Sequence, residues 1–98
     1  MEVPQIQEVV LQAMLRINLT RRPKDRLGVS ANAPIFGPGS PLDSLGLVAL
    51  LIEVEEALQD AGHDVTLSDA RAMSLTQSPF RDVPSLVAFI ASLMAEAR

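Results

Sequence analysis

Apolar side chains recur every three or four residues in three long segments of this chain, the spacing of one face of an α-helix. We predict helices over Val3–Leu19, Ser44–Ala61 and Pro84–Ala97. A shorter apolar series indicates a short helix over Thr66–Ser74. The inward-facing residues of the first and last helices are predicted to be Ile6, Val9, Val10, Ala13, Met14 and Ile17, and Leu86, Val87, Ile90, Leu93 and Met94.

Proline and glycine interrupt this periodicity between residues 20 and 42. Long connections of this kind in small domains are either functional or mobile, and the sequence is compatible with both. No segment alternates apolar and polar residues as a strand does. We therefore predict an all-α fold: one domain over residues 1–98, a small four-helix bundle of three longer helices and one short third helix, with a long loop between helices one and two.

The helix predicted from residue 44 carries two apolar faces, whereas a helix on a small bundle needs only one. The core face holds Leu47, Leu50, Leu51, Val54 and Leu58. A second apolar stripe lies nearly opposite, beside two carboxylates. It is either a docking face for other proteins or a surface covered by the short third helix. The residues of this second stripe are Leu45, Val48, Ala49 and Ile52, with Glu55 and Glu56 beside them.

Composition removes several classes of function. The 98 residues include no Cys and one His, which argues against a disulfide framework, a catalytic thiol and a metal site. No apolar run reaches the length of a membrane span, and the first residues lack a signal-peptide pattern, so a cytoplasmic protein is expected. No nucleophile–base pair stands out, so we expect no enzymatic activity and no catalytic residue.

Charge is unevenly distributed along the chain, although the net charge is only −4. Residues 43–64 contain six acids and no Lys or Arg, whereas residues 16–26 contain five bases and one acid, Asp25. The acidic part would repel nucleic acid and attract basic proteins. The basic part lacks interleaved aromatics, so we interpret it as a solvated loop and expect no nucleic-acid partner.

The segment Leu42-Asp43-Ser44-Leu45-Gly46 joins the long loop to the second helix. Taken alone it is a helix start, because Asp and Ser are both good N-caps. A serine here also lies where backbone N–H groups and the helix dipole favour an anion, such as a phosphodiester. With Leu50-Leu51 and Glu53-Val54-Glu55-Glu56 downstream, and Phe80-Arg81-Asp82-Val83-Pro84 before the last helix, this segment resembles the acyl carrier protein family.

The resemblance implies that Ser44 carries a covalent 4'-phosphopantetheine arm attached by a phosphopantetheinyl transferase. The arm would supply the thiol that this Cys-free chain lacks for holding acyl groups as thioesters. Other implied partners are acyl-activating or synthase enzymes with basic docking patches. We expect the chain to be a monomer. The resemblance implies that the transferase recognises Asp43. The full set of implied partner-binding residues is Asp43, Leu45, Val48, Ile52, Glu55 and Glu56.

Several features depart from the family pattern. Ala49 replaces a common Glu, the loop before Ser44 is long, and the chain is less acidic than carriers of fatty-acid synthesis. These differences favour a specialised lipid or secondary-metabolite pathway. Two alternatives remain: an aminoacyl or peptidyl carrier, and an unmodified interaction module in which Ser44 is only an N-cap. Residues that could line a shelter for an apolar cargo, or simply pack the core, are Leu47, Leu51, Met73 and Ile90.

Overall fold

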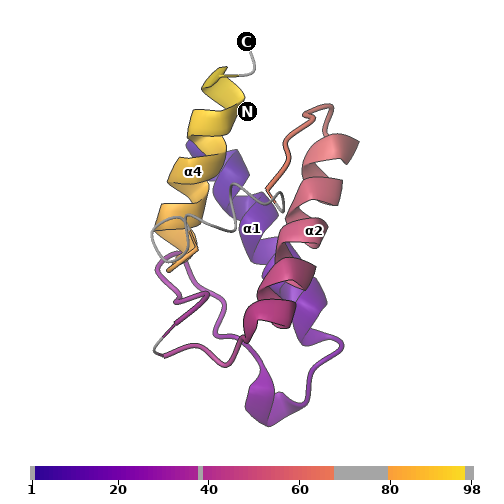
Figure 1. Ribbon diagram of the computed structural model, residues 1–98, viewed down its shortest axis with the longest axis vertical. Helices are drawn as coiled ribbons and strands as arrows, with labels where there is room; N and C mark the ends of the chain where they lie inside the picture. The colour runs from indigo at the N-terminus through magenta and orange to yellow at the C-terminus, as the bar shows by residue number, and fades with distance from the viewer. Residues whose placement is uncertain (1, 38, 68–79, 97–98) are drawn as a thin grey trace.

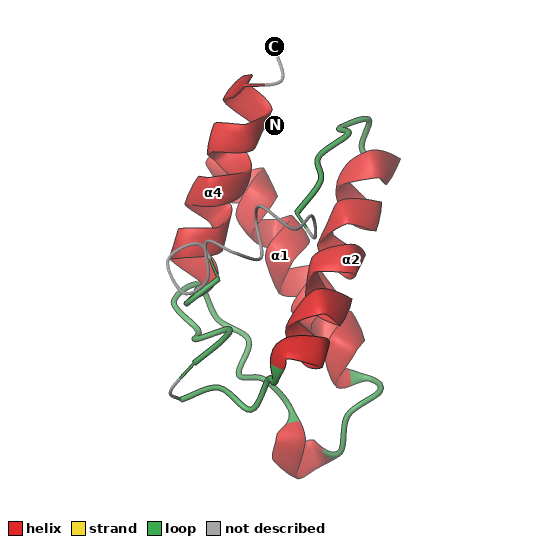
Figure 2. Cartoon of the chain, viewed as in Figure 1, coloured by secondary structure: helices red, strands yellow, loops and turns green. Residues whose placement is uncertain are grey.

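The computed structural model describes residues 2–37, 39–67 and 80–96. Within these ranges the fold is all-α, and β-structure is limited to one isolated antiparallel bridge between Pro34 and Asp82. The described helices appear in Figures 1 and 2 and are α1 (Val3–Asn18), the 3₁₀ helix η1 (Pro23–Asp25), α2 (Ser44–Asp60) and α4 (Val83–Glu96).

Helix α1 is the central packing element of the described chain. It packs against both α2 and α4 and lies behind and between them in Figure 1. Its predicted inner face is confirmed: four of the six predicted residues are buried, and the other two, Val9 and Ile17, are partly exposed and pack against the core. The helix ends one residue earlier than predicted, with Leu19 as its C-cap. The buried residues of α1 are Ile6, Val10, Ala13 and Met14.

Helices α2 and α4 complete the core with the faces expected from their periodicity. The five core-face residues predicted for α2 are all buried, the most exposed being Leu47 at 3%. Gly62, at φ 90°, ends α2 in the left-handed conformation that favours glycine. On α4, Leu86, Val87 and Ile90 are buried, and Leu93 and Met94 are partly buried against the core.

The long loop between α1 and α2, described except for residue 38, contributes to the core. The Asn18 side chain holds it at one end: its amide donates to the Leu27 carbonyl at 3.0 Å, and its oxygen accepts from the Leu27 N–H at 2.8 Å. Further along, the Ile35 N–H donates to the Arg81 carbonyl at 2.9 Å. The four loop residues that this arrangement buries are Leu27, Ala33, Ile35 and Leu42.

The predicted short helix over Thr66–Ser74 falls mostly on residues 68–79, which lie outside the described residues, as does Met73. The segment between α2 and this predicted helix is described, and in it Val65 and Leu67 are buried. None of the described helices combines the length and the apolar character needed to cross a membrane.

Candidate functional site

The start of α2 is built by Asp43 as the N-cap residue. Asp43 has an extended backbone, and its Oδ1 accepts from the Gly46 N–H at 2.7 Å. Its carbonyl accepts from the Leu47 N–H at 2.9 Å. Ser44 is therefore the first helical residue, and the hypothesis that Ser44 is the N-cap is wrong. Asp43 takes that position because its carboxylate satisfies a helical N–H more strongly than a neutral hydroxyl does.

The Ser44 side chain is open to solvent. It is exposed, and its Oγ makes no hydrogen bond within the described part of the chain. The backbone N–H groups of Ser44 and Leu45 also find no acceptor among the described residues, as expected for a first helical turn. A hydroxyl and two N–H donors that are unpaired within the described chain thus lie at the positive end of α2.

Gly46 allows the loop to approach this helix start closely. A Cβ at position 46 would lie 2.8 Å from Cδ2 of Leu42 and 3.2 Å from Oδ1 of Asp43. The first distance is shorter than carbon atoms tolerate without a shift, and the second would press on the capping oxygen. Glycine at this position therefore lets Leu42 stay buried while Asp43 caps the helix.

Three basic residues that we interpreted as part of a solvated loop make specific contacts. Arg16 pairs with Glu53 across α1 and α2, with Nε to Oε2 at 2.9 Å. Arg21 donates from Nε to the Asp25 carbonyl at 2.7 Å. Arg26 donates from Nε to the carbonyl of Asn18 at 3.0 Å. Carbonyl oxygens in a loop and at a helix end attract guanidinium donors, and charge counting along the sequence could not show this.

The second apolar stripe of α2 is accessible. Leu45 is 79% exposed and Ile52 is 43% exposed, Ala49 is exposed, and Val48 is half-buried. The element that could cover this stripe, the short helix predicted over Thr66–Ser74, lies mostly outside the described residues. An apolar series of this kind along one helix is typical of a surface that contacts other proteins.

The two glutamates beside the stripe differ. Glu56 is exposed. Glu55 is half-buried, and its carboxylate accepts a hydrogen bond from the Leu67 N–H, which ties the segment after α2 back to the helix. Sequence reasoning missed this contact because it joins residues 12 positions apart with no periodic signal.

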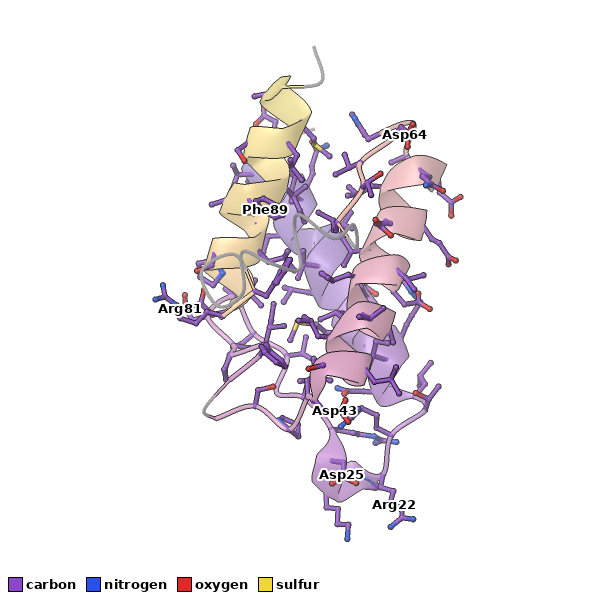
Figure 3. The ribbon with its side chains drawn as sticks, in the orientation of Figure 1. Arg22, Asp25, Asp43, Asp64, Arg81 and Phe89 are labelled. Atoms are coloured by element: carbon purple, nitrogen blue, oxygen red, sulfur yellow. The ribbon has the colours of Figure 1, made fainter. Side chains whose placement is uncertain are left out.

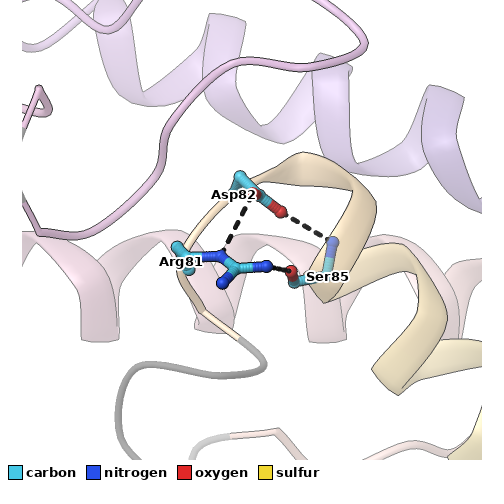
Figure 4. Close-up of polar contacts among 3 residues, drawn as sticks. All are labelled: Arg81, Asp82 and Ser85. Carbon is cyan, nitrogen blue, oxygen red and sulfur yellow. Dashed lines mark hydrogen bonds and ion pairs between the residues drawn. The ribbon is translucent and has the colours of Figure 1, made fainter.

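The start of α4 repeats the cap of α2 in different surroundings. Asp82 precedes the helix and accepts from the Ser85 N–H at 2.9 Å, while Arg81 donates to Asp82 at 3.3 Å and to the Ser85 hydroxyl at 3.4 Å (Figure 4). Hydrogen bonds from the Ser85 hydroxyl and N–H, helped by Arg81, lower the pKa of Asp82 below its ordinary value of 3.8, although slight burial opposes them.

The residues expected to line a shelter for cargo are packed. Leu47, Leu51 and Ile90 are each at most 3% exposed within the continuous core. In the described ranges no group of His, Asp and Glu residues is arranged to hold a metal ion.

The described residues that the resemblance selected for the arm and for partner binding therefore all lie on α2 or at its N-cap, and all but Val48 and Glu55 are exposed. Comparisons of the chain with protein-family models, with curated proteins and with solved structures found no match in any of the three.

Proposed function

We propose that this chain is a carrier protein whose Ser44 holds a 4'-phosphopantetheine arm. The single observation that carries the proposal is the state of the Ser44 hydroxyl: exposed, without a hydrogen bond to the described chain, and at the first position of a helix already capped by Asp43. A serine kept only for capping would occupy the cap itself.

The residues at the start of α2 fit a phosphate ester. The oxygen of Ser44 would form the bond to phosphorus, the anhydride bond of coenzyme A would break to release adenosine 3',5'-bisphosphate, and the hydroxyl proton would pass to the transferase or to water. The N–H groups of Ser44 and Leu45 lie at the positive end of the helix, where an anion is stabilised. When bound, the arm supplies a thiol that carries acyl groups as thioesters.

The outer face of α2 supports a carrier role because a carrier must bind several enzymes in turn. Leu45 and Ile52 offer apolar contact, Val48 lies between them, and Glu56 adds a negative rim for basic partner residues. We infer that the partners are a phosphopantetheinyl transferase and acyl-activating or synthase enzymes with basic patches. Glu55 contributes through its contact with the Leu67 backbone, which fixes the segment beside this face.

The cargo we propose is an acyl group of a specialised lipid or secondary-metabolite pathway, with an aminoacyl or peptidyl group as the alternative. The helix predicted over Thr66–Ser74 would complete a four-helix bundle. The core offers no preformed shelter at Leu47, Leu51 or Ile90, so a sheltered cargo would require α2 to separate from its neighbours.

Mass spectrometry tests the proposal. The purified chain is incubated with coenzyme A, Mg²⁺ and, separately, several phosphopantetheinyl transferases of broad specificity. We expect a mass increase of one phosphopantetheine group in the wild type and in a Ser92→Ala control, and none in Ser44→Ala. Ser92 is an exposed serine on α4, so its removal controls for the loss of a surface hydroxyl. An unmodified wild-type chain with every transferase would contradict the proposal.

A further inference from the structure

Most of the basic residues between positions 16 and 26 are engaged inside the molecule. Arg16 pairs with Glu53, Arg21 donates to two loop carbonyl oxygens, and Arg26 donates to the carbonyl of Asn18. The Arg16 pair joins α1 to the middle of α2, and the Arg21 and Arg26 contacts hold the loop against the end of α1 and the segment before α2. They account for three of the five positive charges in this stretch.

The other two, Arg22 and Lys24, have no such role. Both are exposed, and neither side chain makes a hydrogen bond or an ion pair with any described residue. Figure 3 shows the Arg22 side chain directed outward near η1, beyond Asp43 and the start of α2. Asp25 is the only acid within this stretch and is half-buried. Next to them is an open hollow of about 270 Å³ lined by Thr20, Arg21, Arg22 and Asp25.

An exposed apolar residue lies beside these two bases. Leu19, the C-cap of α1, is 80% exposed, the highest value among the large apolar side chains described. The loop that follows it is held close to the start of α2, because Arg21 Nη2 approaches the Pro41 carbonyl at 3.5 Å. The set Leu19, Arg22 and Lys24, called here the basic patch, therefore borders the start of α2.

The surface around Ser44 is consequently dipolar. The exposed acids Glu56 and Asp60 lie along α2 toward its end, Asp43 caps its start, and Arg22 and Lys24 lie beyond that start. A partner with basic residues alone would be attracted by α2 and repelled by the basic patch. Only a partner with charge of both signs, in the matching order, is attracted along the whole surface.

We propose that the enzyme that attaches the arm to Ser44 binds the basic patch through an acidic surface with an apolar centre, in addition to its contact with α2. This inference rests on the proposed carrier function. The Leu19 side chain supplies the apolar contact, and Arg22 and Lys24 pair with partner carboxylates. The patch thereby sets the orientation of the carrier as well as its rate of association.

The test compares kcat/KM for arm attachment to the full chain, using coenzyme A and a transferase that modifies the wild type. Replacing both bases in Arg22→Gln/Lys24→Gln should lower kcat/KM about tenfold at low ionic strength and weaken its dependence on NaCl, because two attractive contacts are lost. The control Ala88→Glu/Ser92→Glu makes the same change in net charge at two exposed positions of α4 and should leave the rate near that of the wild type.

The sign of the effect decides the outcome. A faster reaction of the double variant would show that the partner surface is wholly basic and would overturn the proposal, as would an unchanged rate. Self-association of the wild type at low salt, detected by sedimentation and abolished in the double variant, would assign the patch to a second copy instead. A wild type that accepts no arm would overturn the carrier function itself, and this inference with it.

Discussion

The starts of α2 and α4 share one local design but differ in their surroundings. In each, an aspartate before the helix accepts from the N–H three residues later: Asp43 from Gly46 at 2.7 Å, and Asp82 from Ser85 at 2.9 Å. At α4 the neighbouring groups are used internally, since Arg81 contacts both the cap and Ser85 and its carbonyl accepts from the long loop. At α2 the neighbouring Ser44 hydroxyl and the N–H groups of Ser44 and Leu45 have no partner within the described chain.

This difference shows why a capping motif alone does not indicate function. Both caps satisfy backbone donors that any helix start leaves unpaired. What distinguishes the two is whether the remaining polar groups are paired within the chain. At α4 they hold the loop and the helix together, and at α2 they remain available to another molecule. The function we propose is placed at the start of α2, where these polar groups have no partner within the described chain.

The largest contrast between the two starts concerns apolar packing. Phe80 is 1% exposed and meets Phe89 edge to face, with ring centroids 5.9 Å apart. We expect Phe80→Ala to lower the free energy of unfolding by about 3–5 kcal/mol, because it leaves a cavity beneath the start of α4. Truncation of the exposed apolar residue in the first turn of α2, Leu45→Ala, should change it by less than about 0.5 kcal/mol. Urea denaturation followed by circular dichroism measures both, and equal losses would contradict the contrast.

A side chain at position 46 should disturb the start of α2 next most strongly. We expect Gly46→Val to cost about 1–3 kcal/mol, because its Cβ would displace Leu42 and press on the cap. Ala49→Val, on the exposed face of the same helix, controls for helix propensity and should cost less than about 0.7 kcal/mol. Thermal or urea unfolding reports both values. A Gly46→Val protein as stable as the control would show that the close approach of Leu42 is unimportant.

The cap of α4 should show its ionisation in the pH dependence of stability. Asp82→Ala should cost about 1 kcal/mol near neutral pH, as losses of N-caps do. Because the pKa of Asp82 is lowered in the folded state, its ionised form contributes stability above pH 3.8. That contribution is lost as pH falls below 3.8 through the folded pKa, so the difference between wild type and Asp82→Ala should shrink there. A difference that stays constant to lower pH would contradict this.

Asp43 offers a way to separate capping from recognition. Asn caps a helix about as well as Asp, so Asp43→Asn should change stability by only a few tenths of a kcal/mol. The same substitution should reduce arm attachment to Ser44, because the resemblance assigns the Asp43 charge to recognition by the transferase. Urea titrations and intact-mass kinetics on the same samples check the two expectations. An Asp43→Asn variant that accepts the arm as fast as the wild type would contradict a role of Asp43 in recognition and leave helix capping as its role.

A small effect on stability is also expected at Ser44, the residue that we propose carries the arm. Ser44→Ala should change the free energy of unfolding by less than about 0.5 kcal/mol, because the hydroxyl is exposed and makes no hydrogen bond within the described ranges. Calorimetry provides the comparison. A loss of about 1 kcal/mol or more would assign Ser44 a structural role and remove the reason for proposing a functional one.

Helix boundaries and faces were predictable because they follow a local period. The two-faced character of α2, with Leu50 buried and Leu45 exposed, came from the sequence in this way. The choice between Asp43 and Ser44 as N-cap did not, since both types favour that position. The path of the described part of the long loop depends on contacts such as Asn18 with Leu27, which join a helix end to a loop without any repeating pattern.

Localising the arm is the most direct test of the carrier assignment. After incubation with coenzyme A and a transferase, trypsin releases a peptide from Leu27 to Arg71 that contains Ser44 and three other serines. We predict that fragment ions place one phosphopantetheine group on Ser44. A group found on another serine, or no group with any transferase tried, would contradict the account.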